Sequence, residues 1–310
     1  MSNKKLFDAF TLQAAFLSNY KLKTPASVLK LINDIVSKGV QEIASAKSEI
    51  TALEAAKAME RRLIRLADEY WKLFGIELEQ ILEEVLDSSK AVIDSIIYKE
   101  EKDKLKNKKE DNTVIPTILA LTTSARLIIA GTNKNPVTRT PTQAVNKMFK
   151  DMAARNMVEA LDIRKKVLDG KDFTMPMNAY WFNQSRNFSN TLLNRGVQES
   201  NHYVFKLVPE ITGYRYNAIL DAKTTLLCET LHGTVRIKYT DLPIPPLHWN
   251  CRSIIIPVIG DIVEEKILPF SSFKSWYNQL DPMLQKAWLS SKQTAPNAFE
   301  DIRKQLRSLS

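Results

Sequence analysis

The sequence predicts an α+β fold that is mostly α, with long N-terminal helices followed by a small antiparallel sheet packed on helices and a helical C-terminal tail. Apolar residues recur at the 3.6-residue period of a helix through most of the first half. Only eight glycines occur in 310 residues, which favours few turns and much helix. Runs of β-branched and aromatic residues follow His202. We therefore expect strands only after about residue 200.

Composition and charge are those of a soluble globular protein with real cores, either one large domain or two ordinary ones. The net charge is +9, and residues 1–111 contribute none of it, so any surface that faces DNA is expected later in the chain. The N-terminus lacks the pattern of a secretory signal. The uncharged run 114–125 is shorter than the roughly 20 residues that span a bilayer. We expect a protein that is made and kept in a cytoplasm, without a membrane partner.

The first 110 residues are expected to form helices. Residues 3–20 have one apolar side, and a second helix is expected to begin with Thr24 as N-cap and to end or kink at Gly39. Residues 40–110 predict two long antiparallel helices hinged near Gly75, ending in a mixed charge run. Their apolar stripes are read as core. The alternative is a helical arm that leaves apolar surface for a ring-shaped partner.

The middle of the chain carries the basic excess. A helix is expected from Val114 to about Ala130, then a linker over 131–141, then a helix over 142–168. A basic helix face can bind phosphates along a nucleic-acid backbone, or it can be an ordinary solvated face. We prefer the second interpretation. The candidate nucleic-acid-binding residues are Arg139, Lys147, Lys150, Arg164, Lys165 and Lys166.

The last part of the chain is expected to mix helix and strand. Residues 178–200 predict a helix broken near Gly196. Strands are expected at 203–208, 214–220, 234–239 and 253–258, and tail helices near 271, 282 and 298–309. The predicted organisation is a helical domain or arm at 1–130, a linker and basic helix at 131–177, an α+β domain at 178–260 and a helical tail at 261–310.

Both cysteines and two of the three histidines lie in one stretch, residues 214–257. Cys228-x3-His232 precedes a glycine, and His248-x2-Cys251 follows. Two thiols and two imidazoles could give tetrahedral zinc coordination, so these four residues are the candidate ligands of a structural zinc ion. Gly233 follows the first pair, where a tight turn would need positive φ.

A reading without metal stays open for the same residues. Cys228 can pack as a small apolar residue, and Cys251 can close a strand end. The spacing is not that of a standard zinc finger. A disulfide is disfavoured because the chain has no secretory signal and offers only one pair.

The stretch also resembles the signature of bacteriophage head morphogenesis proteins, the Mu protein F-like family of minor head proteins. The resemblance extends back to about Trp181 and covers roughly a quarter of the chain. Family members often have proline where this chain has Trp249 and arginine where it has Lys223. The matching positions are Asp221, Thr224, Cys228, Leu231, His232, Gly233, Pro245, Pro246, His248, Asn250, Cys251 and Arg252.

The resemblance implies a virion component near the portal rather than a known reaction. The expected partners are the portal protein of a tailed phage, capsid or scaffolding protein, and DNA bound without sequence specificity. The expected location is the head interior or portal vertex, after assembly in the host cytoplasm.

No catalytic set is predicted. The chain lacks a glycine-rich phosphate loop and a Gly-x-Ser-x-Gly elbow. A Cys–His nucleophilic pair could be built from the same stretch, but no oxyanion site accompanies it. The alternative function is a zinc-dependent, nuclease-like enzyme using Asp221, His232 and His248, with the metal activating water.

Overall fold

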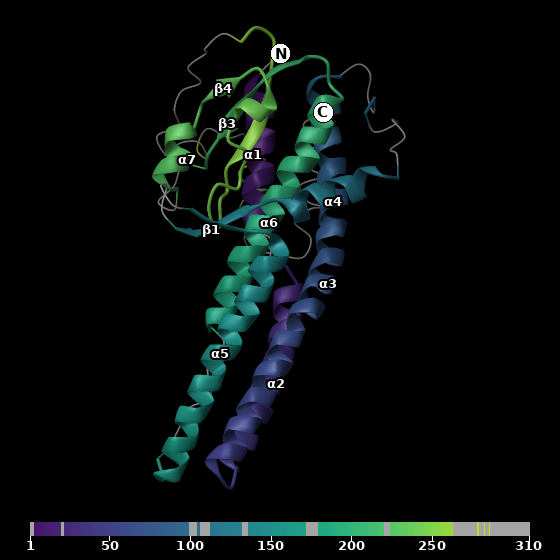
Figure 1. Cartoon of the computed structure of the whole chain (residues 1–310). Coiled ribbons are helices and arrows are strands. Elements are labelled where there is room, and N and C mark those ends of the chain that lie inside the picture. Colours follow the sequence, from purple (N-terminus) through teal and green to yellow (C-terminus); the bar gives the residue numbers. More distant parts are fainter. Residues whose placement is uncertain are drawn as a thin grey trace. The chain divides into compact units, whose positions relative to one another are not determined.

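The computed structural model describes residues 3–19, 22–98, 104–105, 112–131, 136–171, 179–219 and 224–262, with single residues at 278, 282 and 285. These residues form two compact units. Unit 1 comprises Met1–Lys21, Glu79–Thr138 and Asn190–Ser310, and unit 2 comprises Leu22–Leu78 and Arg139–Ser189. The predicted class, mostly helical α+β with a small antiparallel sheet, is confirmed (Figure 1). The predicted domain boundaries stay predictions.

Unit 2 is built from helices α2 (Thr24–Ala44), α5 (Pro141–Leu168), the first part of α3 (Glu49–Ile96) and the first part of α6 (Ala179–Lys206). The α5 helix begins with a capping box. The hydroxyl of Thr140 accepts from the backbone N–H of Gln143, and the Gln143 side chain accepts from the N–H of Thr140. This reciprocal pair satisfies two donors that a helix N-terminus otherwise leaves without partners.

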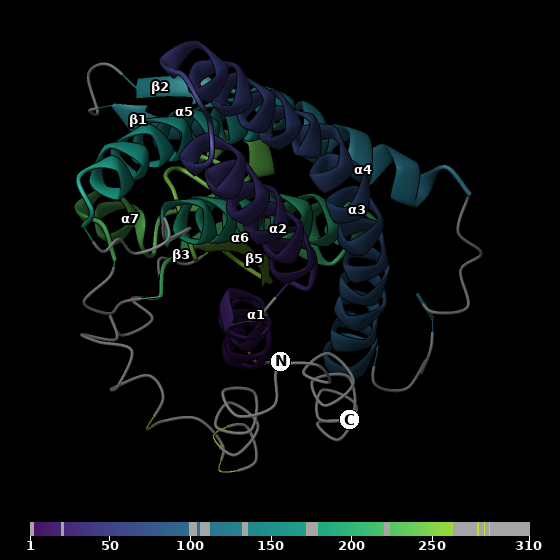
Figure 2. The ribbon, with the colours of Figure 1, turned by 90° about the horizontal axis from the view of Figure 1, so that it is seen from below.

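Within unit 2, α2 and the start of α3 run antiparallel. Thr24, at the beginning of α2, donates to Glu77, whereas the last turns of α2 lie beside Met59. A Cβ atom at Gly39 would lie 2.5 Å from the sulfur of Met59, so only glycine permits this approach. The α2 helix also packs against α5 (Figures 1 and 2).

An aromatic cluster forms the core of unit 2. The Tyr70 side chain is fully buried, and its hydroxyl lies 2.9 Å from the hydroxyl of Ser189 in a hydrogen bond. Its ring centroid lies between 5.7 and 6.3 Å from those of four other rings. Those rings belong to Phe74, Phe149, Trp181 and Phe188. Edge-to-face and offset pairs of this kind stabilise a core beyond their burial.

Unit 1 contains the three-stranded sheet, in the order β4-β3-β5. Strand β3 (Ile211–Asn217) is central and pairs antiparallel with β4 (Val235–Arg236) and β5 (Ile254–Ile259). Helix α1 (Asn3–Asn19) packs on β5, and the side chain of Asn3 bonds the backbone N–H and C=O of Ile259. The sheet edge is therefore tied to the start of the chain.

A buried polar trio joins three helices of unit 1. Gln13 donates to Ser89, Ser89 donates to Asn201, and Asn201 donates back to Gln13, at 2.9, 2.6 and 3.0 Å. The side chains of Ser89 and Asn201 are fully buried. Buried polar side chains are tolerated where each has its hydrogen-bond partners. A fully bonded network of this kind favours one arrangement of the helices that carry it.

Glycine was a poor marker of helix ends in this chain. The expected end at Gly39 is wrong, because α2 continues to Ala44. The expected hinge at Gly75 and the break at Gly196 are also wrong, because α3 and α6 are continuous there. At Gly196 a Cβ atom would lie 2.5 Å from Leu82, so this glycine serves close packing.

Five other local predictions need correction. Strands do occur before residue 200, because β1 (Leu127–Gly131) pairs with β2 (Pro136–Arg139) in the region predicted as a helix end and linker. The predicted strand 203–208 is wrong up to Lys206, where α6 ends. The predicted strand 234–239 is reduced to the two residues of β4. Helix α4 (Val114–Ser124) ends earlier than expected, and Thr24 is the first residue of α2 rather than its N-cap.

Several predictions fall outside the described residues. They are most of the charge run 99–111, Asp221 of the signature, and nearly all of the predicted tail helices after residue 262. Among the helices that are described, none combines the length and the apolar character needed to cross a membrane.

Candidate metal centre

Cys228 is placed by a short helix, α7 (Leu226–Leu231). The hydroxyl of Thr225 caps this helix by accepting from the backbone N–H of Cys228. The helix ends at a turn in which Gly233 has a φ of +83°, the left-handed region that an L side chain rarely adopts. The predicted role of Gly233 as a tight turn is thus confirmed, and the turn returns the chain to the sheet at β4.

His248 and Cys251 lie on the loop that leads into β5. Side chains of α6 hold this loop by hydrogen bonds to the backbone of the loop. The Thr191 hydroxyl accepts from the N–H of Asn250. Asn194 donates to the carbonyls of Cys251 and Ser253. Further along the same helix face, Gln198 also donates to the Ser253 carbonyl and accepts from the N–H of Ile255. Side chains of α6 therefore position Cys251 through hydrogen bonds to the backbone of its loop.

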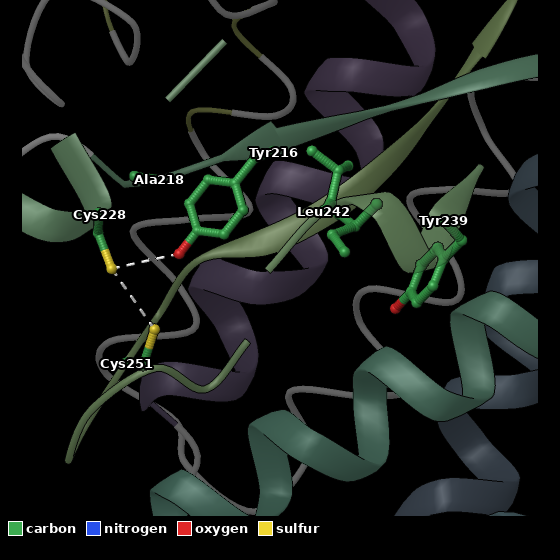
Figure 3. Packing of buried hydrophobic residues seen from close by; sticks show 7 residues of the cluster. Tyr216, Ala218, Cys228, Tyr239, Leu242 and Cys251 are labelled. Carbon is green, nitrogen blue, oxygen red and sulfur yellow. Dashed lines mark hydrogen bonds between the residues drawn. The ribbon is translucent and has the colours of Figure 1, made fainter. Parts of the chain in front are cut away.

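The two thiols and one imidazole meet in space. The sulfur atoms of Cys228 and Cys251 lie 3.7 Å apart (Figure 3). Nε2 of His248 lies 3.2 Å from the sulfur of Cys228. All three candidate ligand atoms lie within 4.8 Å of one another. The Cys228 and Cys251 side chains are each only 2 % exposed, and both thiols are free. These three residues, called the Cys2His cluster below, could hold a metal ion.

The surroundings of the Cys2His cluster are apolar on one side. Cys228 and Cys251 also belong to a buried group with Tyr216, Tyr239 and Ile255. The hydroxyl of Tyr216 lies 3.3 Å from the sulfur of Cys228 (Figure 3). Both cysteines thus belong to a buried group, and this burial does not compete with their capacity to bind a metal.

The tautomer of His248 suits a metal ligand. Its Nδ1 lies 2.8 Å from the carbonyl oxygen of Trp249, and a carbonyl can only accept, so Nδ1 carries the proton. In the neutral ring the lone pair is then on Nε2, the atom that faces Cys228. Metal-bound histidines usually donate their second N–H in this way, which fixes the orientation of the ring.

Hydrogen bonds within the cluster favour the thiolate form of Cys228. The hydrogen bonds from Cys251 and then from His248 outweigh burial and lower the pKa of Cys228 to about 3. The same contact with Cys228 raises the pKa of His248 and that of Cys251. Thiolates and neutral imidazoles are the forms that bind a metal, so metal binding at this cluster would release protons and would depend on pH.

The prediction that all four candidate ligands lie together needs correction at His232. Its Nδ1 accepts a hydrogen bond from the backbone N–H of Ala218 at 3.1 Å, and it is not part of the Cys2His cluster. Burial, followed by the charge of Arg215, lowers the pKa of His232. His232 therefore joins the end of α7 to the chain just after β3.

The other signature residues have local roles. Thr224 donates to the carbonyl of Ile219, and Leu231 packs against the buried group that contains Cys228. Arg252 and Thr224 line a pocket that reaches Cys228 and His248. Pro245 and Pro246 are joined by a cis peptide bond, and Asn250 has a φ of +55°.

The candidate nucleic-acid-binding residues belong to unit 2, whereas the Cys2His cluster belongs to unit 1. Lys147, Lys150, Lys165 and Lys166 are exposed on α5, whereas Arg139 and Arg164 are half-buried. Two of the lysines form ion pairs along the helix, Lys147 with Asp151 and Lys166 with Asp162. The interpretations as a solvated face and as a phosphate-tracking face both remain predictions.

Sequence reasoning missed the residues of α6 that hold the site. Thr191, Asn194 and Gln198 recur at the spacing of one helix face, within a helix whose other buried positions are largely apolar. Such a polar stripe on a helix indicates that the helix binds a neighbouring backbone.

The comparisons with known proteins returned nothing for this chain: no family model, curated protein or solved structure matches it.

Proposed function

We propose that the protein is a minor head protein of a tailed bacteriophage, which binds the portal and assists head assembly or DNA delivery. One observation carries the proposal. Three residues of the signature, Cys228, His248 and Cys251, are separated by up to 23 positions and yet form one cluster. The resemblance that these residues carry in the sequence supplies the role. Capsid or scaffolding protein and packaged DNA are further proposed partners.

In this proposal the Cys2His cluster holds a structural zinc ion. Two sulfurs at about 2.3 Å from one tetrahedral zinc ion are separated by about 3.8 Å. The distance between the Cys228 and Cys251 sulfurs is 3.7 Å. Zinc bound there would hold α7 and the loop before β5 together. No observation favours the nuclease-like alternative, which needs His232 as a ligand although its Nδ1 accepts from Ala218.

The proposed portal-binding surface is the end of unit 2 that carries the turn between α2 and α3. Figure 1 shows the turn between α2 and α3 and the end of α5 at the same end of this unit. Ile50 and Leu168 there are 72 % and 65 % exposed. Exposed apolar side chains that gather at one end of a unit are typical of protein–protein contacts. Ile50 belongs to the charge-neutral residues 1–111, whereas Leu168 follows the basic last turn of α5.

Co-expression with the portal protein of the same phage tests this proposal. We expect a complex that survives purification, and the pair of changes Ile50→Glu and Leu168→Glu should remove it by burying charge at the contact. Ile237→Glu is the matched control, because Ile237 is 71 % exposed in unit 1. Virions that lack the protein should assemble or infect poorly, and full infectivity without it would reject the proposed role.

DNA contact through α5 has a separate test. If Arg164, Lys165 and Lys166 contact phosphates, binding is independent of sequence and weakens steeply with salt. Changing the three to glutamine should reduce the slope of log K against log salt by about 2.7, since each phosphate contact contributes about 0.9. The control is a variant in which three other exposed lysines of unit 2 are changed to glutamine, namely Lys38, Lys47 and Lys57. An unchanged slope in the first variant would remove α5 from the DNA-facing surface.

A further inference from the structure

The two cysteines of the Cys2His cluster are a pair of neighbouring thiols as well as candidate metal ligands. Their sulfur atoms lie 3.7 Å apart, and neither thiol takes part in a disulfide. A disulfide bond is about 2.05 Å long, so the sulfurs would have to approach each other by about 1.65 Å to form one. The fold has therefore already brought Cys228 and Cys251 nearly to bonding distance, although 22 residues separate them in the chain.

Helix α7 is the segment that can make this small shift. All six of its residues are described, and only Cys228 among them is buried. Leu226 and Leu227 of the same helix are 77 % and 38 % exposed. Cys251, in contrast, lies on a loop whose backbone is hydrogen-bonded to side chains of α6. Because Cys228 is the most deeply buried anchor of α7, the short helix can follow its sulfur toward Cys251.

The two cysteines differ in their relation to a small pocket of unit 1. The pocket has a volume of about 10 Å³, and its lining includes Cys228 and His248 but not Cys251. A cavity of this size holds about one water molecule, so a very small oxidant such as hydrogen peroxide suits it best. Cys228 is therefore the cysteine that peroxide would attack first, and Cys251 is the second thiol that would resolve the product.

We infer that Cys228 and Cys251 form a redox-active dithiol–disulfide pair, whose oxidation by a peroxide closes the metal site. This inference rests on the proposed metal centre and deepens it, because it gives that centre a means of regulation. One disulfide removes both thiolate ligands and leaves only His248, so a zinc ion held there would be released. A reducing compartment maintains the two thiols, and an oxidising one maintains the disulfide.

The reaction balances with hydrogen peroxide as its only co-reactant. The Cys228 sulfur attacks one peroxide oxygen, the O–O bond breaks, and the products are a sulfenic acid and a water molecule. The Cys251 sulfur then attacks the Cys228 sulfur. The S–S bond forms as the S–O bond breaks, and a second water molecule leaves. The two sulfurs together lose two electrons, which reduce the peroxide, and the two thiol protons leave in the water.

Peroxide treatment of the full chain, first freed of metal by a chelator, tests the pair directly. The chain has only two cysteines, so a disulfide within one chain can join only Cys228 to Cys251. We expect both free thiols, counted after unfolding in urea, to disappear in a chain that stays monomeric and loses two hydrogen atoms of mass. Dithiothreitol should restore both thiols, which distinguishes a disulfide from sulfinic acid.

Two serine variants test the order of attack, with circular dichroism to check that each is folded. Cys251→Ser should give a sulfenic acid at Cys228, which dimedone traps. Cys228→Ser should react roughly tenfold more slowly, because Cys251 does not line the pocket. Equal rates in the two folded variants would overturn the assignment of Cys228 as the first sulfur attacked.

The remaining outcomes separate the inference from the proposal on which it rests. In the zinc-loaded chain, peroxide should release about one zinc ion for each disulfide formed. Thiols that stay reduced in the folded chain, while the urea-unfolded chain is oxidised, would overturn the inference and leave the metal centre intact. Products limited to sulfinic acid or to disulfides between chains would overturn it as well. A chain that forms the internal disulfide but never binds zinc would reject the metal centre and not the dithiol pair.

Discussion

Replacing Cys251 by serine is expected to abolish zinc binding and to destabilise unit 1. Loss of a partner outside the first shell of a zinc site already costs about 10–100-fold in affinity, so loss of a thiolate ligand should cost more than about 100-fold. A ligand at 100 times its dissociation constant stabilises the fold by about 2.7 kcal/mol, and the variant forfeits this stabilisation. Urea denaturation with and without a chelator measures the effect. The chelator should destabilise the unchanged protein and have no effect on the variant.

The two histidines of the signature provide the matched control. His248→Ala should behave like the cysteine variant, because Nε2 of His248 faces Cys228 at 3.2 Å. His232→Ala should retain zinc and leave the N–H of the buried Ala218 without this partner, at a cost of about 1–3 kcal/mol. Equal loss of zinc in both histidine variants would restore the four-ligand prediction and contradict the three-ligand cluster.

Tyr70→Ala is expected to be the most destabilising single change in unit 2. Truncating a fully buried aromatic residue leaves a cavity and costs about 3–5 kcal/mol. Tyr70→Phe keeps the ring contacts but leaves the buried hydroxyl of Ser189 without this partner, at a cost of about 1–3 kcal/mol. Denaturation followed by circular dichroism measures both changes.

Ile76→Ala is the control for Tyr70→Ala, because Ile76 is on the same helix and 50 % exposed. Its effect should stay within about 0.5 kcal/mol. If Tyr70→Ala costs no more than Ile76→Ala, the aromatic cluster is not the core of unit 2.

Apolar periodicity predicted the helices well, and single residues predicted their ends badly. The helices near 3–20 and 142–168 appear as α1 and α5 with nearly the expected bounds. Glycine weakens a helix by only about 1 kcal/mol, so tertiary packing can override it. Gly39 and Gly196 show this, since each allows a side chain of another helix to approach its backbone.

The strand errors have a similar cause. Residues 203–206 include aromatic and β-branched side chains typical of strands, yet they form the last turn of α6. Val204 and Phe205 are buried there, and β propensity is weak when tertiary burial favours the helix. The pairing of β1 with β2 was missed because Leu127 and its neighbours continued the apolar pattern of α4.

The site was partly visible in the sequence. The clustering of Cys228, His248 and Cys251 followed from residue types and spacing, as did the turn at Gly233. Spacing alone could not show that His232 faces a backbone N–H, because this depends on where β3 ends relative to α7. Gln198 forms hydrogen bonds with backbone groups that are more than 50 residues away in the sequence. The role of Gln198 is therefore evident only in the fold.

We propose that Cys228, His248 and Cys251 form a structural zinc centre. Metal analysis of the full chain, purified from cells grown with zinc and without a metal-affinity step, tests it most directly. We predict about one zinc ion per chain in the unchanged protein and in His232→Ala, and almost none in Cys228→Ser or His248→Ala. A folded, monodisperse protein that carries no zinc and does not take it up on addition would contradict the claim.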